Sequence, residues 1–145
     1  MRQETTATGV PDRAGGRRRS VVLVLGVAYL ALAVLGIASV GWDEFGFEEP
    51  VRMLGFLGVS TLSSIVHGLL GVVLTIAGLR RAGTAIAPIT LVAFVVMSVF
   101  GGVALVATGA GDPLNLNWWN VLLYLLSAGA CGYVCASGWF KGRTR

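Results

Sequence analysis

The chain has 145 residues, of which 55% are hydrophobic and 12% are charged, and its formal net charge is +4. About a quarter of the residues of a soluble domain are charged, so this composition excludes a water-soluble fold and indicates a membrane protein. It also excludes nucleic acid as a partner, because the cations stand in short blocks beside apolar segments and not across a folded surface.

Residues 1–19 are polar and lack hydrophobic periodicity, which predicts a disordered basic cytoplasmic tail. The tail ends in Arg17, Arg18 and Arg19, which we interpret as an orientation signal or as a weak anchor for anionic lipid headgroups. Residues 20–41 then form the first predicted membrane span, since their apolar run is longer than that of a cleaved signal peptide.

A short acidic loop, 42–52, follows the first span. Its carboxylates belong to Asp43, Glu44, Glu48 and Glu49. Several oxygen ligands of this kind could hold a cation such as calcium. They match none of the spaced patterns of calcium-binding loops, so a solvated acidic loop is favoured.

The second predicted span, 53–79, contains the only histidine, His67. It lies about 12–13 residues from either end of this segment, which places it roughly 18–20 Å from each membrane interface. Small and polar residues recur along the segment at spacings typical of one face of a helix, and in a membrane such a face packs on other helices. We therefore assign Gly68, Gly71, Thr75 and Gly78 to helix packing, and His67, Ser60 and Ser64 to a candidate intramembrane polar site.

Two more spans follow a tight basic turn at 80–83. The third, 84–108, has Pro88 in its first turns, where a missing N–H is tolerated, and a glycine pair at 101–102 that favours a bend or close packing. Residues 109–117 read as a turn-forming loop. The fourth span, 118–140, carries aromatic residues at both ends, as interfacial belts do, and residues 141–145 form a basic cytoplasmic tail.

The distribution of charge predicts the orientation of these spans. Ten of the eleven Lys and Arg residues lie in the N-terminal tail, the 80–81 turn or the C-terminus, and only Arg52 lies in the other loops. Those other loops hold five of the seven acidic residues. The positive-inside rule then predicts an all-α, up-down bundle of four transmembrane helices in the cell membrane, with both termini in the cytoplasm.

Two stretches resemble a known family. They are LGFLGVSTLSSIVHGLLG (54–71) and DPLNLNWWNVLLYLLSAGA (112–130), and they resemble the domain of unknown function 4383 family of bacterial four-span membrane proteins. The similarity covers roughly residues 53–138. The positions that carry it are Val59, Ser60, Leu62, Ile65, Val66, His67, Gly71, Pro113, Leu114 and Asn115. Ser63 and Leu123 stand where the family places further histidines. The resemblance implies a four-span membrane protein and no particular activity, and the two missing histidines weaken a metal or haem role.

The chemistry of the chain argues against an enzyme. It has no zinc-protease, serine-hydrolase or phosphate-loop motif, and no acid stands near His67 in the sequence to orient it. The favoured interpretation is that His67 hydrogen-bonds a neighbouring helix and fixes the packing. The alternative is that His67 binds or relays something, as intramembrane ionisable residues often do.

A metal site is a further alternative. Cys131 and Cys135 share a helical face with Ser127, which favours packing between small residues. His67, Met97 and Cys131 are nevertheless each about 12–13 residues from an end of their predicted helix, and imidazole, thioether and thiol suit Cu(I) or haem iron. We treat these three residues as a speculative metal set.

The sequence thus predicts a non-enzymatic integral membrane protein with a structural, sensory or partner-binding role. It predicts no resident cofactor and no metal; the expected partners are the lipid bilayer and a second copy or other membrane proteins. One alternative is an oligomeric subunit of a small-solute or ion transporter or channel that uses the Ser/His face of the second span. The other is a membrane redox, haem or metal-binding protein.

Overall fold

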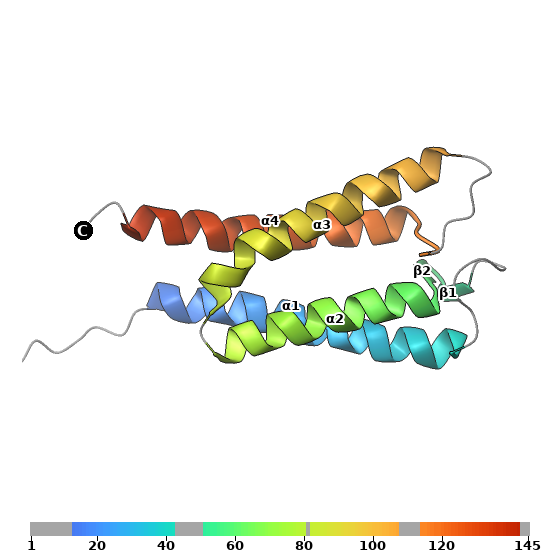
Figure 1. Cartoon of the computed structure of the whole chain (residues 1–145), viewed down its shortest axis with the longest axis horizontal. Coiled ribbons are helices and arrows are strands. Elements are labelled where there is room, and N and C mark those ends of the chain that lie inside the picture. The colour runs from blue at the N-terminus through green and yellow to red at the C-terminus, as the bar shows by residue number, and fades with distance from the viewer. Residues whose placement is uncertain (1–12, 43–50, 81, 108–113, 143–145) are drawn as a thin grey trace, which may run out of the picture.

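The computed structural model describes residues 13–42, 51–80, 82–107 and 114–142 (Figure 1). Its helices are α1 (Arg13–Val40), α2 (Thr61–Leu79), α3 (Gly83–Val106) and α4 (Trp118–Gly142), and a small antiparallel hairpin joins β1 (Val51–Met53) to β2 (Leu57–Val59). All four helices are long and apolar enough to cross a membrane, which confirms the four predicted helices. The four loop carboxylates at 43–49, Asp112 and the C-terminal residues 143–145 lie outside the described residues.

Helix α1 begins earlier than predicted. The sequence predicts a disordered tail up to residue 19, but the helix already starts at Arg13, so Arg17, Arg18 and Arg19 lie on its first turns. Arginine is a good helix former, and a helix already stabilised by its apolar part extends readily into such a run. The prediction of disorder was therefore wrong for residues 13–19.

The predicted second span was wrong at its start. Residues 53–59 are not helical; they belong to the hairpin, whose turn holds Leu54 and Gly55 in the left-handed region, at φ of 55° and 80°. Helix α2 begins at Thr61 because Ser60 is its N-cap. The Ser60 hydroxyl accepts from the Ser63 backbone N–H at 3.1 Å, and the Ser63 hydroxyl accepts from the Ser60 N–H at 2.9 Å.

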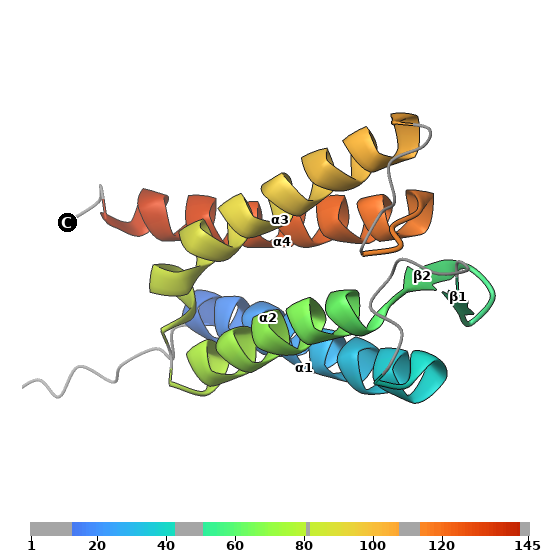
Figure 2. The same ribbon diagram turned by 45° about the vertical axis from the view of Figure 1, so that its right-hand side comes forward.

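The helices form two pairs. Helices α1 and α2 lie side by side, as do α3 and α4, and the two pairs face each other in both views (Figures 1 and 2). One end of the bundle, the hairpin end, holds the hairpin and the starts of α2 and α4. The opposite end, the basic end, holds the arginines at 17–19 and 80, the last turn of α2 and the start of α3.

Small residues set the spacing within each pair. A Cβ atom on Gly71 of α2 would come within 2.7 Å of the backbone nitrogen of Leu30 on α1, and one on Gly26 of α1 would meet Thr75 at 2.5 Å. In the other pair, a Cβ on Gly101 would lie 2.8 Å from a methyl group of Val121 on α4. Backbones approach closely at these positions because a side chain is missing there.

Candidate functional site

Four buried side chains form a polar layer between the two helix pairs. They are Tyr29 of α1, His67 of α2, and Tyr124 and Ser127 of α4, and the exposed fraction of each is 3% or less. Phe94 of α3 packs beside them and is fully buried. All four helices therefore meet at this layer, which contains the candidate polar residue His67.

Two hydrogen bonds cross the layer from one helix pair to the other. The Nε2 atom of His67 lies 2.9 Å from the hydroxyl oxygen of Tyr124, and the Tyr29 hydroxyl lies 2.9 Å from that of Ser127. The Ser127 hydroxyl donates its proton to the carbonyl of Leu123 at 2.8 Å. Ser127 therefore accepts from Tyr29, and the proton of that phenol is already used.

Aromatic rings fill the space around these bonds. The Tyr29 ring lies edge-on to the His67 ring, with centroids 5.4 Å apart, and its centroid is 5.1 Å from that of Phe94. The His67 and Tyr124 rings are 5.8 Å apart. Such contacts stabilise a packed interior. The layer is thus a filled, hydrogen-bonded contact between the pairs.

His67 is not at the centre of its helix. It is the seventh residue of α2, so it lies about 9 Å from the start of the helix and about 18 Å from its end. The predicted distance of roughly 18–20 Å holds only toward the basic end, because residues 53–60 do not belong to the helix. The polar layer therefore lies nearer the hairpin end.

Ser60 and Ser64 serve the start of α2. Ser60 caps the helix, and the Ser64 hydroxyl donates to the Ser60 carbonyl at 2.9 Å. Ser64 also lies against α1, where a Cβ on Gly36 would overlap its hydroxyl. The predicted site of His67, Ser60 and Ser64 is therefore divided: the two serines complete a helix terminus, whereas the histidine reaches across to α4.

The residues assigned to packing lie along α1. Gly71, Thr75 and Gly78 of α2 face Leu30, Gly26 and Leu23 respectively. Gly68 is less tightly packed, because a Cβ there would be 3.5 Å from Ala33, an ordinary contact distance. The stripe on α2 thus lies within the first pair, while His67 extends beyond it to the second.

The speculative metal set is not brought together. His67 bonds Tyr124, whereas Cys131 lies two turns further along α4, roughly 10 Å away along the axis, with its sulfur 3.5 Å from the Thr90 hydroxyl. Met97 and Cys135 are partly buried side chains at the edge of the apolar core. The set rested on equal depth in three helices, and the late start of α2 moves His67 away from that depth. Within the described residues, no group of three His, Cys, Asp or Glu side chains could hold a metal.

A second polar cluster, which we call the asparagine clamp, holds the hairpin to the start of α4. It comprises Asn115, Asn117 and Asn120. The Asn120 side chain accepts from the Gly58 N–H at 3.0 Å and donates to the Gly58 carbonyl at 2.9 Å, so it pairs with β2 as a neighbouring strand would. Asn115 donates to the Val59 carbonyl at 2.9 Å, and Asn117 donates to the carbonyl of Phe56.

Sequence reasoning missed the partners in both clusters. Tyr29 and Tyr124 resemble ordinary aromatic residues of apolar spans, and only their hydroxyl groups hint at a buried partner. The spacing of the three asparagines around the start of α4 was an available signal, because asparagine is unusual in a span and favours turns and helix starts. The sequence alone predicts a loop followed by a helix in this stretch, with no link to residues 56–59.

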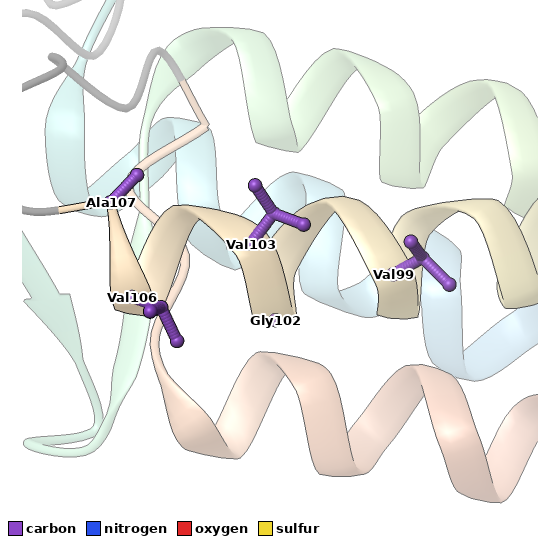
Figure 3. A pocket seen from close by; sticks show the side chains of 5 residues that line it. All are labelled: Val99, Gly102, Val103, Val106 and Ala107. Carbon is purple, nitrogen blue, oxygen red and sulfur yellow. The ribbon is translucent and has the colours of Figure 1, made fainter.

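A surface groove on the described residues is unrelated to either cluster. It is an open groove of about 470 Å³ along the last turns of α3, lined by Val99, Gly102, Val103, Val106 and Ala107 (Figure 3). Every lining residue is apolar, and all belong to α3 except Ala107, its C-cap. The groove therefore offers no polar side chain to a ligand.

Comparison with known proteins agrees with the fold. No curated protein and no solved structure matches the chain. The model of the domain of unknown function (DUF4383) matches residues 19–136, which confirms the resemblance and extends it to the first helix. Because this match spans well over half of the sequence, the chain belongs to the DUF4383 family.

Proposed function

We propose that this chain is a non-enzymatic, multi-pass protein of the cell membrane that binds a partner through its β-hairpin, while the polar layer holds its two helix pairs together. The observation that carries the proposal is at the hairpin. The asparagine clamp fixes strand β2, yet Leu54 at the turn is 69% exposed and has a φ of 55°. A bulky residue held in the left-handed region is strained, and such strain collects at functional sites.

The partner is a second copy of this chain or another membrane protein. Leu54 is joined at the hairpin end by two exposed aromatic side chains, Phe56 and Trp119, whose ring centroids are 5.6 Å apart. Exposed aromatic and apolar side chains on a rigid support are typical of the anchors of protein interfaces. A rigid hairpin also loses little conformational freedom when it binds.

The assignment of the polar layer to packing rests on its hydrogen bonds. The His67 ring and the Tyr29 hydroxyl each bond a group on α4. A histidine that relays protons or binds solutes needs access, whereas the rings of Tyr29, Phe94 and Tyr124 fill the surrounding space. The layer thus resembles a hydrogen-bonded contact between transmembrane helices. Such contacts stabilise helix association in model systems by about 1–2 kcal/mol or less.

The proposed orientation is an up-down bundle with both termini in the cytoplasm and the hairpin on the outer face. It rests on the cations at the basic end and on the acidic residues that the sequence holds between the first and second and between the third and fourth helices. Cysteines introduced at Glu48 and Asp112, in a background without Cys131 and Cys135, should react with an impermeant reagent on intact cells. Cysteines at Arg81 and Thr144 should not. Labelling at Arg81 without labelling at Glu48 would invert the orientation.

Complementation of a deletion strain tests the function itself. The variant Leu54→Asn removes the apolar side chain at the tip of the hairpin. It should fail to complement the deletion strain, and its hairpin should no longer crosslink to the partner. Leu54→Met keeps an apolar side chain at the same strained position and is the matched control. His67→Gln should retain the phenotype, because glutamine also offers a donor and an acceptor.

The opposite pattern would contradict the proposal. If a folded His67→Gln protein lost the phenotype while Leu54→Asn kept it, the function would lie in the polar layer. A transport or relay role would then replace partner binding.

A further inference from the structure

One face of helix α3 carries a regular row of exposed β-branched side chains. Helix α3 is the least buried of the four spans. The row is spaced alternately three and four residues apart, and the exposed fraction of each side chain is at least 58%. We call this row the valine seam; its members are Ile89, Val92, Val96, Val99, Val103 and Val106.

The composition of the valine seam differs from that of the rest of α3. Five of the six valines of the helix lie on the seam, whereas all its leucine, phenylalanine and methionine residues lie elsewhere. The outward face of α4 is mixed by comparison, because Leu126, Gly129 and Tyr133 are exposed there at the same helical spacing. Lipid chains adapt to apolar side chains of any shape, so contact with lipid alone does not require a uniform row.

The spacing of the valine seam is that of a coiled coil. Residues at alternating intervals of three and four occupy the a and d positions of a heptad, whose side chains insert between those of a facing helix. A β-branched side chain strongly prefers one rotamer in a helix, so it loses little freedom when it packs. Helix association in a membrane depends on close packing of side chains, and such a row therefore favours contact with another helix.

The valine seam is also long and open enough for a second helix. From Ile89 to Val106 it extends about 26 Å, close to the roughly 30 Å thickness of the hydrocarbon core of a bilayer. Toward its end, three seam valines line the open groove together with Gly102 (Figure 3). A Cβ on Gly102 would meet nothing within 4 Å, so a neighbouring backbone can approach closely there.

We propose that the valine seam is an interface between copies of this chain, on which the same seam of a second copy packs in parallel. Copies of one membrane protein share one orientation, so a rotation axis normal to the membrane relates them and the same patch is used on both. Each seam residue then meets its own counterpart at the same depth, and the heptad spacing matches along the whole contact.

The chemistry of the valine seam favours a second copy as the partner. The seam has no charged or polar side chain, so an identical seam matches it without leaving a polar group unpaired. Two seams together would bury twelve apolar side chains, six from each copy, and homodimer interfaces are typically more apolar than other interfaces. This interface lies on α3, is separate from the hairpin and does not rest on the function proposed for the hairpin.

Oxidation of single cysteines in membranes tests the interface. The full chain is first freed of its own thiols by Cys131→Ala and Cys135→Ala. Four seam variants are then compared one at a time: Val92→Cys, Val96→Cys, Val99→Cys and Val103→Cys. Each should form a disulfide-linked dimer, because each seam residue lies opposite its counterpart in the second copy.

The matched controls for crosslinking are equally exposed positions on other helices. They are Val34→Cys on α1 and Leu126→Cys on α4, whose side chains are 67% and 65% exposed. The neighbour of Val34, Ala33, faces Gly68 beside His67, so Val34 lies near the level of the polar layer. Both control variants should remain monomeric under the same oxidation.

Association in liposomes gives a second measurement that keeps the native cysteines. Full-length chains fused to donor and acceptor fluorescent proteins report association by energy transfer as added lipid dilutes them. Val96→Phe/Val103→Phe should weaken association roughly tenfold or more, because the larger rings overpack the contact between the seams. Val34→Phe makes the same change on α1 and should associate as the unmodified chain does.

Three results would overturn the proposal. One is as much disulfide-linked dimer from the two control cysteines as from the seam, which would indicate random collision. Another is dimer from Val34→Cys or Leu126→Cys alone, which would place the contact on α1 or α4. A third is equal energy transfer in the double phenylalanine variant and the unmodified chain, which would mean that the valine seam faces lipid.

Discussion

The imidazole of His67 on α2 and the phenol of Tyr124 on α4 are joined by a 2.9 Å hydrogen bond that connects the two helix pairs. Both side chains are almost completely buried, with exposed fractions of 3% and 0%. The bond forms in either tautomer of the ring, because Nε2 can accept from the phenol or, when protonated, donate to it. This contact makes the only histidine of the chain a link between halves of the molecule.

The tight approach of α1 to α2 predicts that Gly71 tolerates no larger side chain. Gly71→Leu should destabilise the bundle by about 1–3 kcal/mol, because the new side chain would meet the backbone of Leu30. Thermal unfolding in detergent measures the effect. Val73→Leu is the control, since Val73 is 45% exposed on the same helix. Equal melting temperatures for Gly71→Leu and the unmodified chain would mean that α2 faces another way.

The asparagine clamp predicts a second sensitive position. Asn120→Ala should leave the buried N–H and carbonyl of Gly58 without their partner, at a cost of about 1–3 kcal/mol for each group that water does not reach. Proteolysis at the hairpin should also become faster than in the unmodified chain, because strand β2 loses its attachment to α4. Leu122→Ala, an exposed change on the same helix, should affect neither measurement. A resistant, fully stable Asn120→Ala protein would show that the hairpin is held by its apolar face alone.

The hairpin turn predicts a substitution that stabilises the fold. Leu54 and Gly55 both have positive φ, and the Phe56 N–H donates to the Met53 carbonyl at 3.3 Å, the arrangement of a type I′ turn. Asparagine is favoured at the first central position, whereas a leucine there costs about 1–2 kcal/mol. Leu54→Asn should therefore raise the melting temperature in detergent. An unchanged or lower melting temperature would argue against a left-handed conformation at Leu54.

Much of the architecture could be predicted from the sequence because membrane helices are defined by length and apolarity alone. The hairpin could not. The run MLGFLGV at 53–59 is apolar throughout, and a short apolar run fits a strand or a helix equally well. The pair Gly55 and Gly58, followed by Ser60 three residues before Ser63, was the local evidence for a turn and a helix start.

The candidate site could be predicted only in part for a different reason. His67 is recognisable from sequence because an ionisable residue within a span is rare. Its partner Tyr124 lies 57 residues away on another helix, and the pairing depends on how the helix pairs face each other. The predicted depth of His67 in the membrane was wrong because it depends on where α2 begins. The Ser60 N-cap sets that start.

A double-mutant cycle between His67 and Tyr124 tests the central claim most directly. His67→Leu and Tyr124→Phe should each destabilise the bundle in detergent, since each leaves a buried polar group without its partner, at about 1–3 kcal/mol. The combined variant should be more stable than the sum of the two losses predicts, by about 0.5–2 kcal/mol, because both polar groups are then gone. Strictly additive losses, or a His67→Leu protein as stable as the unmodified chain, would contradict the claim that this bond joins the two helix pairs.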